Sequence, residues 1–114
     1  MEISFTGKVA SKNDIDMVTG RALWVGSWEK QFDANQDSIL VCPKTDFLDV
    51  SKLAKFRAIV SATGGALCHA AIIARELGIP AIVGVGIENY EKVKTGDELQ
   101  LNMLTGEITC DGGK

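Results

Sequence analysis

Short apolar runs separated by polar or glycine-containing stretches predict that most of this chain is β-structure. A first strand is expected through Ile3, Phe5 and Val9, and the polar stretch 11–16 separates it from the next. The later runs that predict strands are 22–25, 38–42, 58–60, 81–83, 99–103 and 107–110. Thr105-Gly106 predicts a turn, so the last two runs are expected to pair as a closing hairpin.

Two segments have helical spacing instead. Residues 49–56 suit a short amphipathic helix, with Asp46 or Asp49 near its start as a cap. Residues 70–77 are rich in strong helix formers. Since this second helix lies between the runs 58–60 and 81–83, those runs are expected to form a parallel pair with a right-handed crossover.

The ends of the second helix are marked by glycines. Gly64 and Gly65 break the preceding strand-like run, so the helix is expected to start between Leu67 and Ala70. We expect Gly65 to be needed wherever this turn requires a positive φ. Gly78 is predicted to lie just past the helix end, and Pro80 prevents continuation.

His69 is the only histidine of the chain, and it falls at this predicted helix start. The first amides of a helix have no intrahelical partner, and the terminus carries about half a positive charge, which favours anions. The same dipole disfavours a second cation, so more of the imidazole stays neutral and nucleophilic. On spacing alone, a hydrogen-bonded structural role is the commoner fate of such a histidine. With no second histidine and no Cys-x-x-Cys pair, a zinc site of familiar spacing is not expected.

Composition narrows the functional classes. A chain of 114 residues, 46% hydrophobic, suits one domain over residues 1–114 and is too short to hold a further catalytic domain. A net charge of −3 without a basic cluster argues against a nucleic-acid partner. No apolar run is long enough for a membrane span, and the start does not resemble a signal peptide. Three cysteines without paired spacing favour a reduced, cytoplasmic protein.

Four further features are expected to be structural. Trp24 and Trp28 are more simply explained by packing than by a docking surface. Arg75 lies six positions after His69, on a different side of the helix, and is expected to form a structural ion pair. Cys68 and His69 are neighbours whose side chains diverge along a helix, which argues against a Cys-His nucleophile pair. The segment 84–86 is expected to end a strand and turn the chain.

One sequence motif makes a functional role for His69 more plausible than its spacing alone does. The motif covers residues 64–84 and reads Gly-Gly-x-x-Cys-His-Ala-Ala-Ile-Ile-Ala-Arg-Glu-Leu-Gly-Ile-Pro-Ala-Ile-Val-Gly. It closely resembles the phosphohistidine, or swivelling, domain of the phosphoenolpyruvate-utilising enzymes, with the motif nearest to phosphoenolpyruvate synthase (pyruvate, water dikinase). Residues 14–25, 40–46 and 95–107 resemble other parts of that domain more weakly. The resemblance implies a single compact α/β domain, arranged β/β/α, with the phosphohistidine at a helix N-terminus.

The resemblance also implies a carrier function. His69 matches the histidine that accepts a phosphoryl group, Gly64 and Gly65 match the loop before it, and the backbone amides near Cys68 and Ala70 are expected to hold the phosphoryl oxygens. No cofactor is expected on this domain. ATP and magnesium would bind to an ATP-grasp partner, and a barrel that handles pyruvate and phosphoenolpyruvate would be a second partner. The chain would then be a phosphotransferase component that needs partner domains for turnover.

Two positions depart from the family pattern. Ala62 stands where many members have an acidic or amide residue, and Leu67 stands where many have a threonine that a regulatory kinase modifies. Leu67 has no hydroxyl to be modified. These changes leave an alternative open, in which the chain is a non-catalytic binding or regulatory module that retains the swivelling fold.

Overall fold

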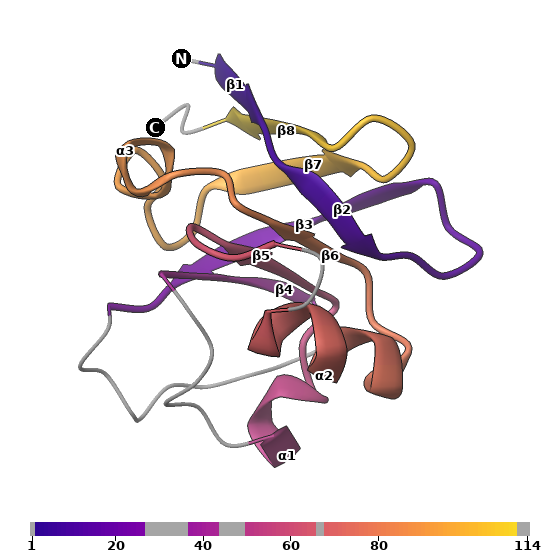
Figure 1. Cartoon of the computed structure of the whole chain (residues 1–114). Helices are drawn as coiled ribbons and strands as arrows, with labels where there is room; N and C mark the ends of the chain where they lie inside the picture. The colour runs from indigo at the N-terminus through magenta and orange to yellow at the C-terminus, as the bar shows by residue number, and fades with distance from the viewer. Residues whose placement is uncertain (1, 27–36, 44–49, 66–67, 112–114) are drawn as a thin grey trace.

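A computed structural model describes residues 2–26, 37–43, 50–65 and 68–111 of the chain, which form a mixed sheet with few helices (Figure 1). The elements in these residues are β1 (Glu2–Thr6), β2 (Lys8–Ser11), β3 (Met17–Trp24), β4 (Ser38–Cys42), α1 (Val50–Leu53), β5 (Ala58–Ser61), α2 (His69–Leu77), β6 (Ala81–Val83), α3 (Ile87–Tyr90), β7 (Glu98–Asn102) and β8 (Glu107–Asp111).

The strands are hydrogen-bonded in the order β1-β8-β7-β3-β4-β5-β6-β2. β3, β4, β5 and β6 run parallel to one another, and all other neighbours are antiparallel. The parallel pairing of β5 with β6 and the β7–β8 hairpin confirm two of the expected pairings. The helix that connects β5 to β6 therefore lies over the parallel part of the sheet.

The prediction of a single first strand is wrong, because this part of the chain is divided at Gly7 into β1 and β2. These two strands occupy opposite ends of the strand order, so the sheet curls back on itself (Figure 1). Only glycine fits at the crossing: a Cβ atom on Gly7 would lie 2.8 Å from the Val83 carbonyl oxygen and 2.6 Å from Val85 Cγ1. The Gly7 N–H donates to the Gly106 carbonyl at 3.0 Å, which fixes the crossing to the closing hairpin.

Two large apolar clusters lie on the two faces of the parallel strands. One cluster fills the inside of the curled sheet, and its members include Phe5, Ile39, Val60, Ile82 and Ile108. The second lies between the parallel strands and helices α1 and α2, and its members include Leu40, Leu53, Ile59, Ala74 and Ala81. β4 and β5 contribute to both clusters, so these strands are buried on both faces, as their continuous apolar sequences require.

Other differences from the expected elements have local causes. β3 begins at Met17, five residues before the expected run, because its first half pairs with β7 while its second half pairs with β4. α3 was not expected, since four residues are too few to establish a period. α1 is shorter than the expected 49–56, and the capping residues Asp46 and Asp49 lie outside the described residues.

Trp24 is a packing residue. Its ring stacks on Tyr90 with centroids 4.8 Å apart, and its Nε1–H donates to the Tyr90 carbonyl at 3.0 Å. The Tyr90 hydroxyl donates in turn to the Val25 carbonyl at 2.6 Å. These bonds attach α3 to the end of β3, while Trp28 lies outside the described residues. Within the described ranges, no helix is long and apolar enough to cross a membrane.

Candidate functional site

His69 is the first residue of α2, within the range expected for the helix start, and it is half-buried. Cys68 precedes it as the N-cap, with an extended backbone (φ −73°, ψ 166°) and no side-chain capping bond. The first hydrogen bond of the helix runs from the Ile72 N–H to the Cys68 carbonyl at 3.1 Å. The amides of Ala70 and Ala71 therefore have no intrahelical acceptor, which is the arrangement that binds anions.

Small side chains bring this end of the helix close to the sheet. Ala70 and Ala71 are buried against Ala10 of β2 and Val83 of β6, and the half-buried Cys68 packs on the same cluster. The Cys68 side chain thus contributes to packing between helix and sheet. The Cys68 N–H donates to the Gly65 carbonyl at 3.1 Å, so this amide is engaged in the turn. The open amides at the helix start are those of Ala70 and Ala71, and the expected phosphate binding by the amides near Cys68 and Ala70 stays a prediction.

The two glycines before the helix have different roles. Gly64 has φ +112°, and a Cβ atom there would lie 2.5 Å from Cys68 Sγ. Gly65 is not among the positive-φ glycines, and a Cβ atom there would meet nothing within 4 Å. The expectation that Gly65 requires glycine is therefore wrong, and the requirement belongs to Gly64. The packing of the Cys68 side chain is what excludes a larger residue at Gly64.

The chain before Gly64 is held by hydroxyl groups that the sequence did not single out. The Pro43 carbonyl accepts from the Thr63 N–H at 3.1 Å and from Thr63 Oγ1–H at 2.8 Å. Ser61 Oγ, itself buried, lies 3.2 Å from the same carbonyl and 2.9 Å from the Thr63 carbonyl. These contacts join the end of β5 to the end of β4, a long-range arrangement that no local spacing indicates.

Gly84 supports the loop from the other side. It follows β6 with φ +70°, and a Cβ atom there would lie 2.9 Å from the Gly64 carbonyl oxygen. The Gly86 N–H then donates to the Ala62 carbonyl at 2.9 Å. The expected strand end and turn at 84–86 is confirmed, and it also positions the backbone that leads to His69.

The far end of α2 ends as expected. Gly78 is the C-cap in the left-handed conformation, with φ +71°, and the Ile79 N–H donates to the Ala74 carbonyl at 3.0 Å. Arg75 is a structural residue, but its partner is a carbonyl: its Nε–H donates to the Ala10 carbonyl at 2.8 Å. This bond fastens the helix to the edge strand β2.

The three cysteines are all free thiols. Burial raises the pKa of Cys42 from 9.0 to about 12. The pKa of Cys110 is also raised to about 12, first by burial and then by its hydrogen bond to Asp97, whose Oδ2 lies 3.3 Å from the thiol sulfur. These two thiols remain protonated near neutral pH and lie in the two apolar clusters.

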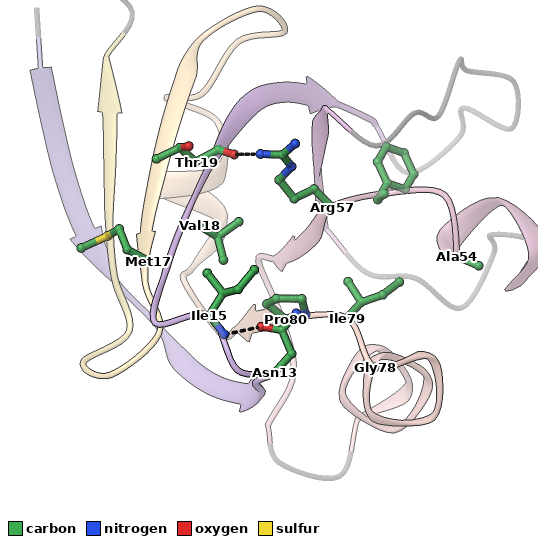
Figure 2. Close-up of a pocket in the computed structure, with 11 residues that line it drawn as sticks. Asn13, Ile15, Met17, Val18, Thr19, Ala54, Arg57, Gly78, Ile79 and Pro80 are labelled. Carbon is green, nitrogen blue, oxygen red and sulfur yellow. Dashed lines mark hydrogen bonds between the residues drawn. The ribbon is translucent and has the colours of Figure 1, made fainter.

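A pocket of about 510 Å³ lies at the opposite end of α2 (Figure 2). Figure 2 shows Ile15, Val18 and Pro80 on one side of it and the Arg57 side chain across from them. Gly78, which lines this pocket, is nine residues from His69, or about 13 Å along a helix at 1.5 Å per residue. The pocket is therefore separate from the histidine.

Among the described residues, no group of three or more His, Cys, Asp or Glu side chains could hold a metal ion.

Sequence comparison matches residues 34–114 to the family described as PEP-utilising enzyme, mobile domain. The phosphoenolpyruvate synthase of Aquifex aeolicus (strain VF5) is 41% identical over 91 residues, which are 80% of this chain and 10% of that protein. The chain therefore spans about a tenth of the length of the curated relative that it matches.

Solved structures support the same fold. An Enzyme I structure determined by NMR aligns with a TM-score of 0.52 and 26% identity, over 68% of this chain and 32% of that chain. A UPF0107 protein, also solved by NMR, aligns with a TM-score of 0.69 over 93% of this chain and 97% of that chain. Its identity is 18%, so this second likeness concerns the fold alone.

Proposed function

Because the chain belongs to the family of mobile domains of phosphoenolpyruvate-utilising enzymes, we propose that it is a phosphohistidine carrier, with His69 as the phosphoryl acceptor and transient donor. The observation that carries the proposal is the placement of the one histidine of the chain as the first residue of α2. A nucleophile there lies beside amides that stabilise the negative charge it receives.

The transfer needs little covalent chemistry from this domain. A ring nitrogen of neutral His69 attacks the phosphorus atom of the donor. The N–P bond forms as the P–O bond to the leaving phosphate breaks, and that oxygen keeps the electron pair. The open amides of Ala70 and Ala71 stabilise the phosphoryl oxygens, and the packed turn at Gly64 keeps these amides in place before the donor arrives.

The remaining parts of the reaction belong to partners. ATP and magnesium would bind to an ATP-grasp domain or protein, where the metal supplies charge neutralisation for the transferred group. The second site would lie on a barrel that handles pyruvate and phosphoenolpyruvate. The mobile domain would carry the phosphoryl group from one to the other. We place the reaction in the cytoplasm, where three free thiols stay reduced.

Labelling in trans tests the proposal. The donor enzyme is the Aquifex aeolicus phosphoenolpyruvate synthase with its own carrier histidine replaced, supplied with ATP labelled in its phosphates. We expect label on wild-type chain and on Cys68→Ser, and none on His69→Ala. The label should be lost in mild acid and persist in alkali, as a phosphoramidate does.

Other outcomes of the labelling experiment would contradict the proposal. Acid-stable label, or label that survives in His69→Ala, would place the chemistry on a hydroxyl side chain. A wild-type chain that binds the donor enzyme and accepts no label at His69 would favour the non-catalytic module instead.

A further inference from the structure

A lysine lies beside the start of α2, and its role rests on the proposed function of His69. Lys8 is the first residue of β2 and is exposed. It lies directly opposite Val83, the last residue of β6, in antiparallel register. Residues paired in this way project from the same face of a sheet, with Cβ atoms about 5 Å apart. The position of Val83 therefore gives the direction of the Lys8 side chain.

That direction is toward α2. Val83 packs with Ala70 and Ala71 of the helix, and Ala10, further along β2, packs in the same cluster. Val9, between Lys8 and Ala10, packs instead against the cluster inside the curled sheet, as alternation along a strand requires. Lys8 therefore leaves the sheet on the face that α2 covers.

Lys8 also lies at the same end of the sheet as His69. Val83 Cβ is 3.9 Å from the position that a Cβ atom on Gly64 would occupy, and Gly64 leads into the helix start. The next residue, Gly84, touches the Gly64 carbonyl. β2 starts where β6 ends, so Lys8 lies at the end of the sheet where Val83 approaches Gly64.

The backbone at this point is fixed. Gly7 fits closely between β6 and the Gly106 carbonyl, which leaves Lys8 little freedom of position. The Lys8 ammonium forms no ion pair with any residue that the structure describes. Lys12, just beyond β2, differs in this respect, because its Nζ lies 2.7 Å from Asp16 Oδ1.

We propose that the Lys8 ammonium contacts the phosphoryl group during its transfer to and from His69. It stays protonated throughout and donates hydrogen bonds to the phosphoryl oxygens, while the N–P and P–O bonds exchange at His69 as described above. Together with the amides of α2, it supplies positive charge in a chain whose net charge is −3. Charge-assisted bonds of this kind are stronger than neutral ones.

Phosphorylation by phosphoramidate tests this inference without a partner protein. The P–N bond of the reagent breaks as the N–P bond to His69 forms, and ammonia leaves with the electron pair. Lys8→Gln should slow labelling of His69 by roughly ten- to a hundredfold, the range for one charge-assisted hydrogen bond. Lys8→Arg should keep most of the rate. Lys12→Gln, which changes the net charge equally, should stay within about twofold of wild type.

Salt gives a second readout that a purely structural role would not affect. The wild-type rate should fall as ionic strength rises, because an exposed charge is screened, while the Lys8→Gln rate should change much less. Unchanged unfolding midpoints would show that all three variants are folded.

The outcomes separate this inference from the proposed function. If wild-type His69 is labelled and Lys8→Gln reacts at the same rate with the same salt dependence, Lys8 has no such contact and the carrier function stands. If neither phosphoramidate nor the donor enzyme labels wild-type His69, the carrier function is overturned, and the role of Lys8 with it.

Discussion

Gly64 and Gly65 are adjacent, yet only one of them needs to be glycine. Gly64→Ala places a Cβ atom against Cys68 Sγ at a backbone angle that L-residues rarely adopt. We expect it to lower the free energy of unfolding by about 1–3 kcal/mol. Gly65→Ala is the matched control and should stay within about 0.5 kcal/mol of wild type. Urea unfolding measures both, and equal losses in the two variants would contradict this assignment.

The thiols are expected to differ in reactivity according to burial. Cys68 is half-buried, whereas Cys42 and Cys110 are buried with raised pKa values. Iodoacetamide near pH 8 should therefore modify Cys68 first in the folded protein and all three cysteines after denaturation. Peptide mass spectrometry identifies the modified residue. Modification of Cys42 before Cys68 would contradict the order of reactivity that burial predicts.

Cys42 also makes stability depend on alkaline pH. Below pH 9.0 its thiol is protonated in both states, so its contribution to stability is fully present. Between pH 9.0 and about 12 the unfolded state loses the proton while the folded state keeps it, so the free energy of unfolding falls as pH rises. The limit is about 1.4 kcal/mol per pH unit.

Comparison with a variant isolates this contribution from other groups that titrate in the same range. Below pH 9.0, Cys42→Ala should be less stable than wild type, because it leaves a cavity. Its stability should nevertheless decline less steeply with pH than that of wild type. Parallel curves for the two proteins would mean that the buried thiol does not carry the raised pKa.

Among the elements, β6 and the loop before α2 depend on one another through Gly84. Gly84→Ala adds strain at φ +70° and pushes against the Gly64 carbonyl, 2.9 Å from the new Cβ. We expect about 1–3 kcal/mol of lost stability and slower labelling of His69. Gly78→Ala is the control, since φ is +71° there but the new Cβ would meet nothing within 4 Å.

Gly78→Ala should cost about 1 kcal/mol and leave the labelling rate at the wild-type level, because it lies at the far end of α2. Thermal unfolding and labelling are measured on the same preparations. If both variants slow labelling equally, the effect reflects general destabilisation, and Gly84 has no special role in positioning the loop.

The sequence predicted those elements whose signal is local. The runs at 38–42 and 81–83 match β4 and β6, and Gly78 marks the end of α2, because burial on both faces and a left-handed cap leave direct traces in the residues. The division of the first strand at Gly7 could not be found in this way. Its cause is the close approach of β6 and the Gly106 carbonyl, which are distant in sequence.

The candidate site was predicted in the same uneven way. His69 and its place near a helix start followed from the one histidine and the glycine pair. The assignment of the tight turn to Gly64, the bond that engages the Cys68 amide, and the hydroxyls that hold Pro43 depend on side-chain packing and long-range hydrogen bonds. The place of Lys8 near this site could be identified only from the register in which β2 pairs with β6.

The molecule as a whole should accept a phosphoryl group without catalysing turnover. The chain spans about a tenth of the length of its Aquifex relative, and the pocket that Gly78 lines lies at the end of α2 away from His69. Purified chain should therefore neither hydrolyse ATP nor convert pyruvate, as a coupled assay would show. ATP hydrolysis that is lost in His69→Ala would reveal a catalytic site within this domain.

The carrier function is tested most directly by a chase of the labelled domain. Chain labelled at His69 is separated from ATP and mixed with pyruvate and the donor enzyme whose own carrier histidine is replaced. We expect the label to leave the chain faster than it does by hydrolysis and to appear in phosphoenolpyruvate. Label that stays on the chain, or that is released only as inorganic phosphate at the rate without enzyme, would contradict the account.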